Sequence, residues 1–417
     1  MASLSSLPSL YVLRSAIYLW GIRLSCDAQL APLEPVFATR ALRSVHDALS
    51  AAQEQSQNAL YVLQAEIILA YYFFASNRLL EGKLHASAAV SLAYLCGLHK
   101  MPALGTQQTF TLLPAPTGIL PSAPDPIAEC ERIDAWWATF ILDKTWVVAL
   151  STPSMITEQE ERTIIDTPWP IPAELYVQQL PTAQMTTVMY PGRTVQRFLA
   201  DVLTDNAASS SYPALLAKAA ALYESAYHLA TRTQQGISGL EPALIATEAS
   251  IEQFKQLIPP VSTMDSHAHH LLLISGLTYA ATIQLHQGLT GRSATAMAKC
   301  LSAAHSIVRY TQTLGSTAMG PTAGRVGTVN PLVGVSTASC GGRAAGSAVN
   351  SFRFFAITKV ILTAAGEALV HGLRFMRGSR TSWAANPALP SEDQLVGAIK
   401  LLLSILGNLS AGLPLVG

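Results

Sequence analysis

Apolar residues recur every three or four positions along most of this sequence, and proline clusters separate the stretches in which they do so. Residues 60–74 and 84–95 form two such runs, with a break at 76–78. A repeat of this period is the pattern of an amphipathic helix. Alanine and leucine dominate where strands would need alternating β-branched residues, so the sequence predicts an all-α, multi-helix bundle. The runs at 60–74 and 84–95 are expected to form an antiparallel αα-hairpin.

Two proline-rich stretches, 102–126 and 152–191, are expected to be long surface loops, because proline cannot donate the backbone hydrogen bond of a helix. Residues 127–150 between them have helical spacing and form the most aromatic helix. Residues 315–350 are rich in glycine and small side chains and predict a flexible loop. Further helices are expected at about 194–205, 213–233, 242–257, 267–287, 293–314, 352–375 and 392–409. We expect one joined domain, with an N-terminal part at 1–175 and a C-terminal continuation at 176–417.

Composition narrows the class of protein. Hydrophobic residues make up 50% of the 417, which excludes a disordered chain. The 26 basic and 26 acidic residues balance, so no global field attracts nucleic acid or an anionic membrane. Mean hydropathy is +0.31, but the most apolar windows, 60–75, 271–283 and 395–406, contain or adjoin polar residues and indicate buried helices rather than membrane spans.

The N-terminus lacks the basic segment of a signal peptide. The five cysteines are scattered, and the closest pair, Cys96 and Cys130, is 34 residues apart. This indicates reduced thiols of an intracellular protein and excludes a zinc cluster within the sequence, since zinc ligands come in closely spaced pairs.

Motifs for catalysis are absent from the sequence. It holds no G-x-G, no G-x-S-x-G, no H-E-x-x-H and no Asp-Asp pair, and the glycine-rich residues 341–347 lack the lysine of a phosphate-binding loop. His267, His269 and His270 are read as a polar helix start rather than a metal site. The acidic groups at 129–131 and 158–161 fit a helix N-terminus and a loop. We therefore predict a protein that is not an enzyme and holds no cofactor or metal.

The region from 296 to 391 has nine basic residues and one acidic residue, Glu367, which raises the question of a nucleic-acid surface. The basic residues are thinly spread and no recognition motif accompanies them. A solvated helix face is the preferred interpretation.

The aromatic helix carries the most specific pattern in the sequence. Residues 129–144 resemble the fungal transcription factor regulatory domain, often called the middle homology region. The matching residues are Arg132, Trp136, Trp137, Phe140, Leu142, Asp143, Lys144 and Pro153. The family's arginine cluster is reduced to one arginine, and Ser151 replaces the glycine that precedes the proline.

The upstream hairpin is similar to the family's helix pair, and it ends in the signature Cys96-Gly97-Leu98-His99-Lys100. Residues 16–21 also resemble members from mushroom-type fungi. At Asn330-Pro331 the family continues into an apolar helix containing tryptophan, whereas residues 335–349 here are mainly glycine, serine and alanine. Residues 315–350 are therefore read either as a genuine loop or as the product of a frameshift or a translated intron.

The resemblance implies transcription control in the nucleus, with DNA bound only through a zinc binuclear cluster whose cysteines are not in this sequence. It implies zinc as the cofactor of that cluster, and as partners a homodimer, the transcription machinery or a small-molecule effector, without a membrane. A helical protein-interaction scaffold is the alternative function. Within the aromatic helix, we expect Trp136 and Phe140 to be core anchors. Arg132 and Asp143, about three turns apart, should each pair with another helix.

Overall fold

The computed structural model describes residues 8–25, 27–51, 58–101, 120, 123–171, 192–203, 211–260, 268–318, 343–378, 383 and 388–411. Within these residues the fold is built of helices, and no strand is found, which confirms the all-α prediction. The helices of the first half are α1 (Pro8–Ser25), α2 (Glu34–Ala51), α3 (Asn58–Ala75), α4 (Leu79–Leu95) and α5 (Pro126–Leu150), with short 3-10 turns η1 (Ala31–Leu33) and η2 (Leu98–Lys100). Those of the second half are α7 (Thr194–Ala200), α8 (Tyr212–Gln234), α9 (Glu241–Leu257), α10 (Ala268–Gln287), α11 (Ala294–Ala318), α13 (Arg343–Gly378) and α15 (Glu392–Ala411).

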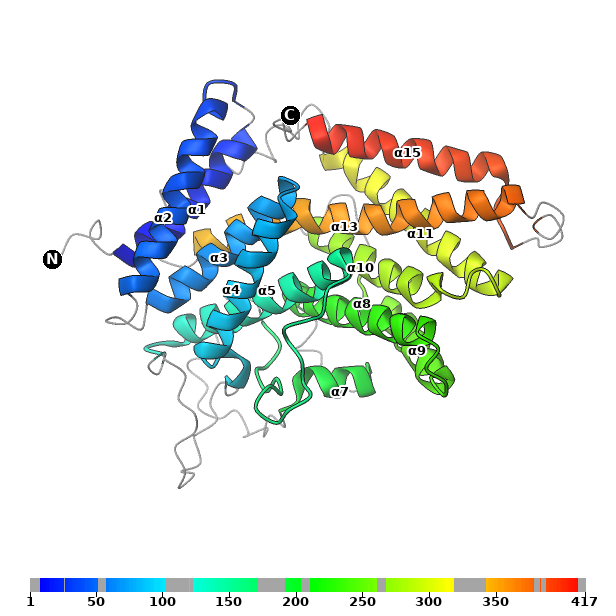
Figure 1. Cartoon of the computed structure of the whole chain (residues 1–417), viewed down its shortest axis with the longest axis horizontal. Helices are drawn as coiled ribbons and strands as arrows, with labels where there is room; N and C mark the ends of the chain where they lie inside the picture. Colours follow the sequence, from blue (N-terminus) through cyan, green and yellow to red (C-terminus); the bar gives the residue numbers. More distant parts are fainter. Residues whose placement is uncertain are drawn as a thin grey trace.

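The α3–α4 pair confirms the predicted αα-hairpin, and α1 and α2 pack beside it at one end of the molecule (Figure 1). Neither α1 nor α2 was predicted from the sequence. The buried stripe of α2 is Ala38, Ala41, Val45 and Ala48, at helical spacing. Three of the four are alanine, whose small side chain gives a weak hydrophobic signal.

The aromatic helix α5 lies in the middle of the fold, where it packs on α3, α4, α8 and α13. Asp125 caps its N-terminus by accepting a hydrogen bond from the backbone N–H of Ala128 at 2.8 Å, and Pro126 occupies the first helical position. The helix ends at Ser151, whose φ of 52° is left-handed. Trp136 and Phe140 are fully buried, which confirms that they are core anchors. Burial on all sides explains why α5 carries so few charged residues in its middle.

The second half differs from the sequence reading at several helix ends. Helix α7 ends at Ala200 rather than 205, and α13 begins at Arg343 rather than 352. With α11 extending to Ala318, the predicted glycine-rich loop at 315–350 is wrong at both ends, while 319–342 lie outside the described residues. A glycine costs a helix only about 1 kcal/mol relative to alanine, which alanine-rich neighbours can outweigh. Of the predicted loops at 102–126 and 152–191, the described residues 120, 123–125 and 152–171 are not helical, whereas Pro126 is the first residue of α5.

Helix α13 crosses the molecule and packs on α10, α11 and α15 at one side and on α3 and α5 at the other (Figure 1). Its stretch Ala356–Gly378 is long and apolar enough, by length and composition alone, to cross a membrane. Most of that stretch is buried inside the fold. A buried core helix passes the same test of length and hydropathy. The windows that the sequence marks as most apolar, 60–75, 271–283 and 395–406, lie in other helices.

Candidate functional site

The family-like signature at residues 96–100 lies where α4 ends and the chain turns into η2. Gly97 has a φ of 69°, a left-handed conformation that glycine adopts without strain, and it directs His99 and Lys100 toward the loop of residues 152–171. The backbone carbonyl of His99 accepts hydrogen bonds from the N–H groups of Asp166 and Thr167 at 2.8 and 3.1 Å. Two chain segments more than sixty residues apart are thereby joined through their backbones.

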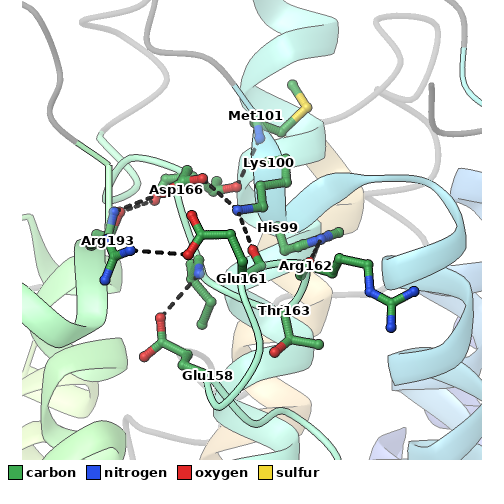
Figure 2. A network of polar contacts seen from close by, with 12 residues as sticks. His99, Lys100, Met101, Glu158, Glu161, Arg162, Thr163, Asp166 and Arg193 are labelled. Carbon is green, nitrogen blue, oxygen red and sulfur yellow. Dashed lines mark hydrogen bonds and ion pairs between the residues drawn. The ribbon is translucent and has the colours of Figure 1, made fainter. Parts of the chain in front are cut away.

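Side chains reinforce this joint, as Figure 2 shows. Lys100 Nζ lies 2.7 Å from Asp166 Oδ2, and the other carboxylate oxygen of Asp166 accepts a hydrogen bond from the backbone N–H of Arg193 at 2.8 Å. Arg193 also pairs with Glu161 at 3.1 Å. We call His99, Lys100, Asp166, Thr167 and Arg193 the polar junction. The Lys100–Asp166 pair is about one-third exposed, so its charges contribute little stability and the buried backbone bonds matter more.

The beginning of loop 152–171 is fastened to α5 by two adjacent residues of the resemblance motif. Asp143, only 2% exposed, accepts hydrogen bonds from Ser154 Oγ at 2.6 Å and from the N–H of Ile156 at 3.1 Å. Lys144 donates from Nζ to Ser154 Oγ at 3.1 Å and to the carbonyl of Ile156 at 2.9 Å. The hydrogen bonds of Asp143 thus go to a loop, and Lys83 of α4 lies 4.0 Å away as an ion-pair partner on another helix.

The far end of the same loop is fastened by the tryptophan pair. Trp137 donates from Nε1 to the carbonyl of Pro168 at 2.7 Å, and its ring stacks on Trp169 with centroids 4.3 Å apart. Trp136 faces a different neighbour, since its ring lies 5.5 Å from Tyr94 and 5.8 Å from His99. Residues of the motif therefore contact both ends of loop 152–171, and Trp136 also packs against His99 of the polar junction.

Burial sets the protonation of the groups in this region. It lowers the pKa of His99, whose Nε2 lies 2.9 Å from the carbonyl of Arg162. The neutral ring then donates from Nε2, because a carbonyl can only accept. Burial also raises the pKa of the Cys96 thiol to about 11 and that of the Glu158 carboxyl, although an N–H from Ile165 opposes the latter shift. A protonated thiol is a poor nucleophile.

The remaining predicted residues take structural positions. Arg132 is buried on α5 beside Cys96 of the α4 end and Glu129 of its own helix, and its tie to another helix stays a prediction. Phe140 lies under the Lys144 ammonium, 5.6 Å from ring centroid to Nζ.

The histidine cluster at 267–270 is only partly described. His267 lies outside the described residues, and His270 stacks on Tyr212 with ring centroids 5.9 Å apart. Within the described part of the chain, no group of three His, Cys, Asp or Glu could hold a metal ion.

Sequence reasoning missed the partners of the motif. Ser154, Ile156, Asp166, Thr167 and Arg193 sit in irregular chain, where no periodicity distinguishes them from their neighbours. A buried Asp-Lys pair on a helix does demand partners, so it signals that some polar loop must return to α5. It does not say which loop.

Comparison with known proteins agrees with this picture. Residues 27–172 match the family model of the fungal specific transcription factor domain. The matched segment begins just before η1 and continues to the end of loop 152–171, so it contains α2, the α3–α4 hairpin, α5 and most of the polar junction. No curated protein and no solved structure matches the chain.

Proposed function

We propose that this chain, whose residues 27–172 are a fungal specific transcription factor domain, regulates transcription in the nucleus in response to an effector or a partner protein. The observation that carries the proposal is the coincidence of the family match with α5 and the loop it fastens at both ends. DNA would be contacted by a zinc binuclear cluster, the only place where zinc would serve as cofactor. The five cysteines of these 417 residues are too far apart to form it.

The side chains of the motif support regulation rather than turnover. Asp143 and Lys144 form hydrogen bonds with Ser154 and Ile156, and the indole N–H of Trp137 donates to the carbonyl of Pro168. These groups position chain segments and do not converge on a space for a substrate. The family itself is a transcription factor domain and not an enzyme family. A domain of this kind transmits signals by shifting between packed arrangements.

A reporter assay tests the proposal. The chain is fused to an unrelated DNA-binding domain in a fungal host, and reporter output is compared with that of the DNA-binding domain alone. We expect the fusion to change the output. The same chain without the fusion partner should fail to retain a defined DNA duplex at physiological salt, because a balanced charge of 26 basic and 26 acidic residues neutralises few phosphates. Sequence-specific, salt-resistant binding by the chain alone would contradict this division of labour.

A protein-interaction scaffold is the second candidate function, and one surface favours it. Leu80, Leu84 and Leu95 project from α4 with 75%, 62% and 56% exposure. Large exposed apolar side chains on one helix are typical of a contact surface for another protein, including a second copy of the chain. A fusion that leaves the reporter unchanged while the purified chain forms a stable dimer or complex would favour this function.

A further inference from the structure

A groove of about 550 Å³ lies between α11 and α15, far from the matched segment and the polar junction. Its partly exposed apolar side chains include Leu389 and Leu401, while Leu301 and Val308 also line it but are buried. This volume is within the range of sites for small organic ligands, whereas a stable protein interface needs about 800 Å² from each partner. The groove thus fits a small molecule better than a protein.

The polar residues of the groove share one chemical character. Arg309 is its only formally charged lining residue, and no lining residue is acidic. His305 donates from Nδ1 to the carbonyl of Leu301 at 2.8 Å, which leaves Nε2 as the other ring nitrogen. Gln394 uses its Oε1 to accept from the N–H of Ser391 at 2.8 Å, so its amide N–H₂ is the part left to donate. A cation and an amide donor suit an anionic oxygen.

The groove is held open by small residues on a well-anchored helix. A Cβ built on Gly397 of α15 would meet no heavy atom within 4 Å. The chain just before α15 is held by Trp383, which donates from Nε1 to the carbonyl of Pro390 at 2.9 Å, whereas the exposed Arg377–Glu392 ion pair adds little. The empty space at Gly397 therefore belongs to a fixed surface and not to a loosely packed helix end.

We propose that this groove binds an amphipathic organic monocarboxylate, with the apolar body on Leu389 and Leu401 and the carboxylate at Arg309 and Gln394. The inference rests on the proposed function, because such a ligand would be the effector of the regulatory domain.

Calorimetric titration of the purified full chain with decanoate, and with 1-decanol as its uncharged counterpart, tests the proposal. We expect saturable binding of one decanoate per chain, and binding of 1-decanol that is roughly 10- to 100-fold weaker, the usual worth of a charge-assisted hydrogen bond. Arg309→Gln should weaken decanoate by a similar factor and leave 1-decanol unchanged. Absence of saturable decanoate binding, or equal binding of the acid and the alcohol, would overturn the proposal.

Gly397→Leu provides the decisive variant, since its Cβ would meet no atom within 4 Å and the rest of the side chain would occupy the groove. Gly407→Leu is its matched control, because it makes the same change on the same helix, also into open space, at a position that does not line the groove. We expect Gly397→Leu to abolish decanoate binding and Gly407→Leu to preserve it. Equal binding by the two variants refutes the site. Because the titration needs no reporter, a chain that regulates a fused DNA-binding domain yet binds no decanoate loses the groove proposal and keeps the proposed function.

Discussion

Replacing Asp143 by asparagine should release the start of loop 152–171 from α5. The carboxylate accepts from Ser154 Oγ and the N–H of Ile156, and both bonds are shielded from water because Asp143 is 2% exposed. Both bonds end on the same carboxylate oxygen, Oδ2. The amide oxygen of asparagine can accept both bonds in its place, but without the negative charge that strengthens them. The neighbouring Lys144 ammonium would also lose a nearby negative charge.

The expected cost follows from these contacts. Hydrogen bonds to an ionised group contribute about 1.5–3 kcal/mol each, and a buried donor left without a partner costs about 1–3 kcal/mol. Because a neutral hydrogen bond contributes only about 0.5–1.5 kcal/mol and Lys144 also loses a nearby counter-charge, Asp143→Asn should reduce the free energy of local loop opening by about 2–4 kcal/mol. Such a change raises the population of the open loop by roughly 30- to 700-fold.

Hydrogen exchange measured by mass spectrometry on a peptide covering residues 152–160 reports this opening directly. The Ile156 amide should exchange faster in Asp143→Asn by the factor given above. Asp134→Asn, the same change at an exposed position of α5, is the matched control and should leave the peptide unaffected. In a Ser154→Ala background, the Asp143 substitution should cost less, because part of the interaction is already gone. An exchange rate within threefold of the unchanged protein would show that the loop does not depend on Asp143.

Three further substitutions test the packing and the charges. Gly82→Ala places a Cβ 2.6 Å from Cε1 of the buried Phe74, so overpacking should reduce the free energy of unfolding by about 1–3 kcal/mol and lower the thermal midpoint. Its control, Gly397→Ala, adds a Cβ in open space within a helix and should raise the midpoint. Trp136→Ala should cost about 3–5 kcal/mol in urea unfolding and give largely insoluble protein, and a soluble variant of unchanged stability would argue against a core anchor. Burial raises the pKa of the Glu131 carboxyl, so the unfolded chain loses this proton at a lower pH than the folded chain, and the free energy of unfolding falls as pH rises. Glu131→Gln should therefore stabilise the fold more at pH 7 than at pH 4. An equal gain in stability at both pH values would contradict the pKa shift.

The aromatic helix was predictable because its signals are local. The Asp125-Pro126 start, the apolar spacing and the break at Pro153 all lie within a few residues of the ends of α5. The start of α13 was not predictable in this way. Its first turns contain one glycine and several alanines and serines, and they follow a glycine-rich segment, a composition that predicts a loop when read without tertiary contacts.

The partners of the site could not be predicted for a different reason. His99 and Arg162, or Asp143 and Ile156, meet only after the chain has folded back across α5, and such contacts leave no periodic trace in the sequence. What the sequence could show was one half of each contact, a charged pair and a histidine in otherwise apolar surroundings. The resemblance to a family marked those halves as important, and the structure supplied the loop that completes them.

Helix α13 offers a physical route between the groove and that loop. Leu301 lines the groove and also presses on α13, where its Cδ2 would lie 2.7 Å from a Cβ at Gly372. The helix is about 54 Å long at 1.5 Å per residue and continues to α3 and α5, so a shift at one end is carried along a stiff rod. We therefore expect decanoate to alter the exchange rate of the Ile156 amide in the unsubstituted chain but not in Gly397→Leu. If binding leaves that rate unchanged, the groove and loop 152–171 are energetically independent, and an effector would have to act through a contact other than α13.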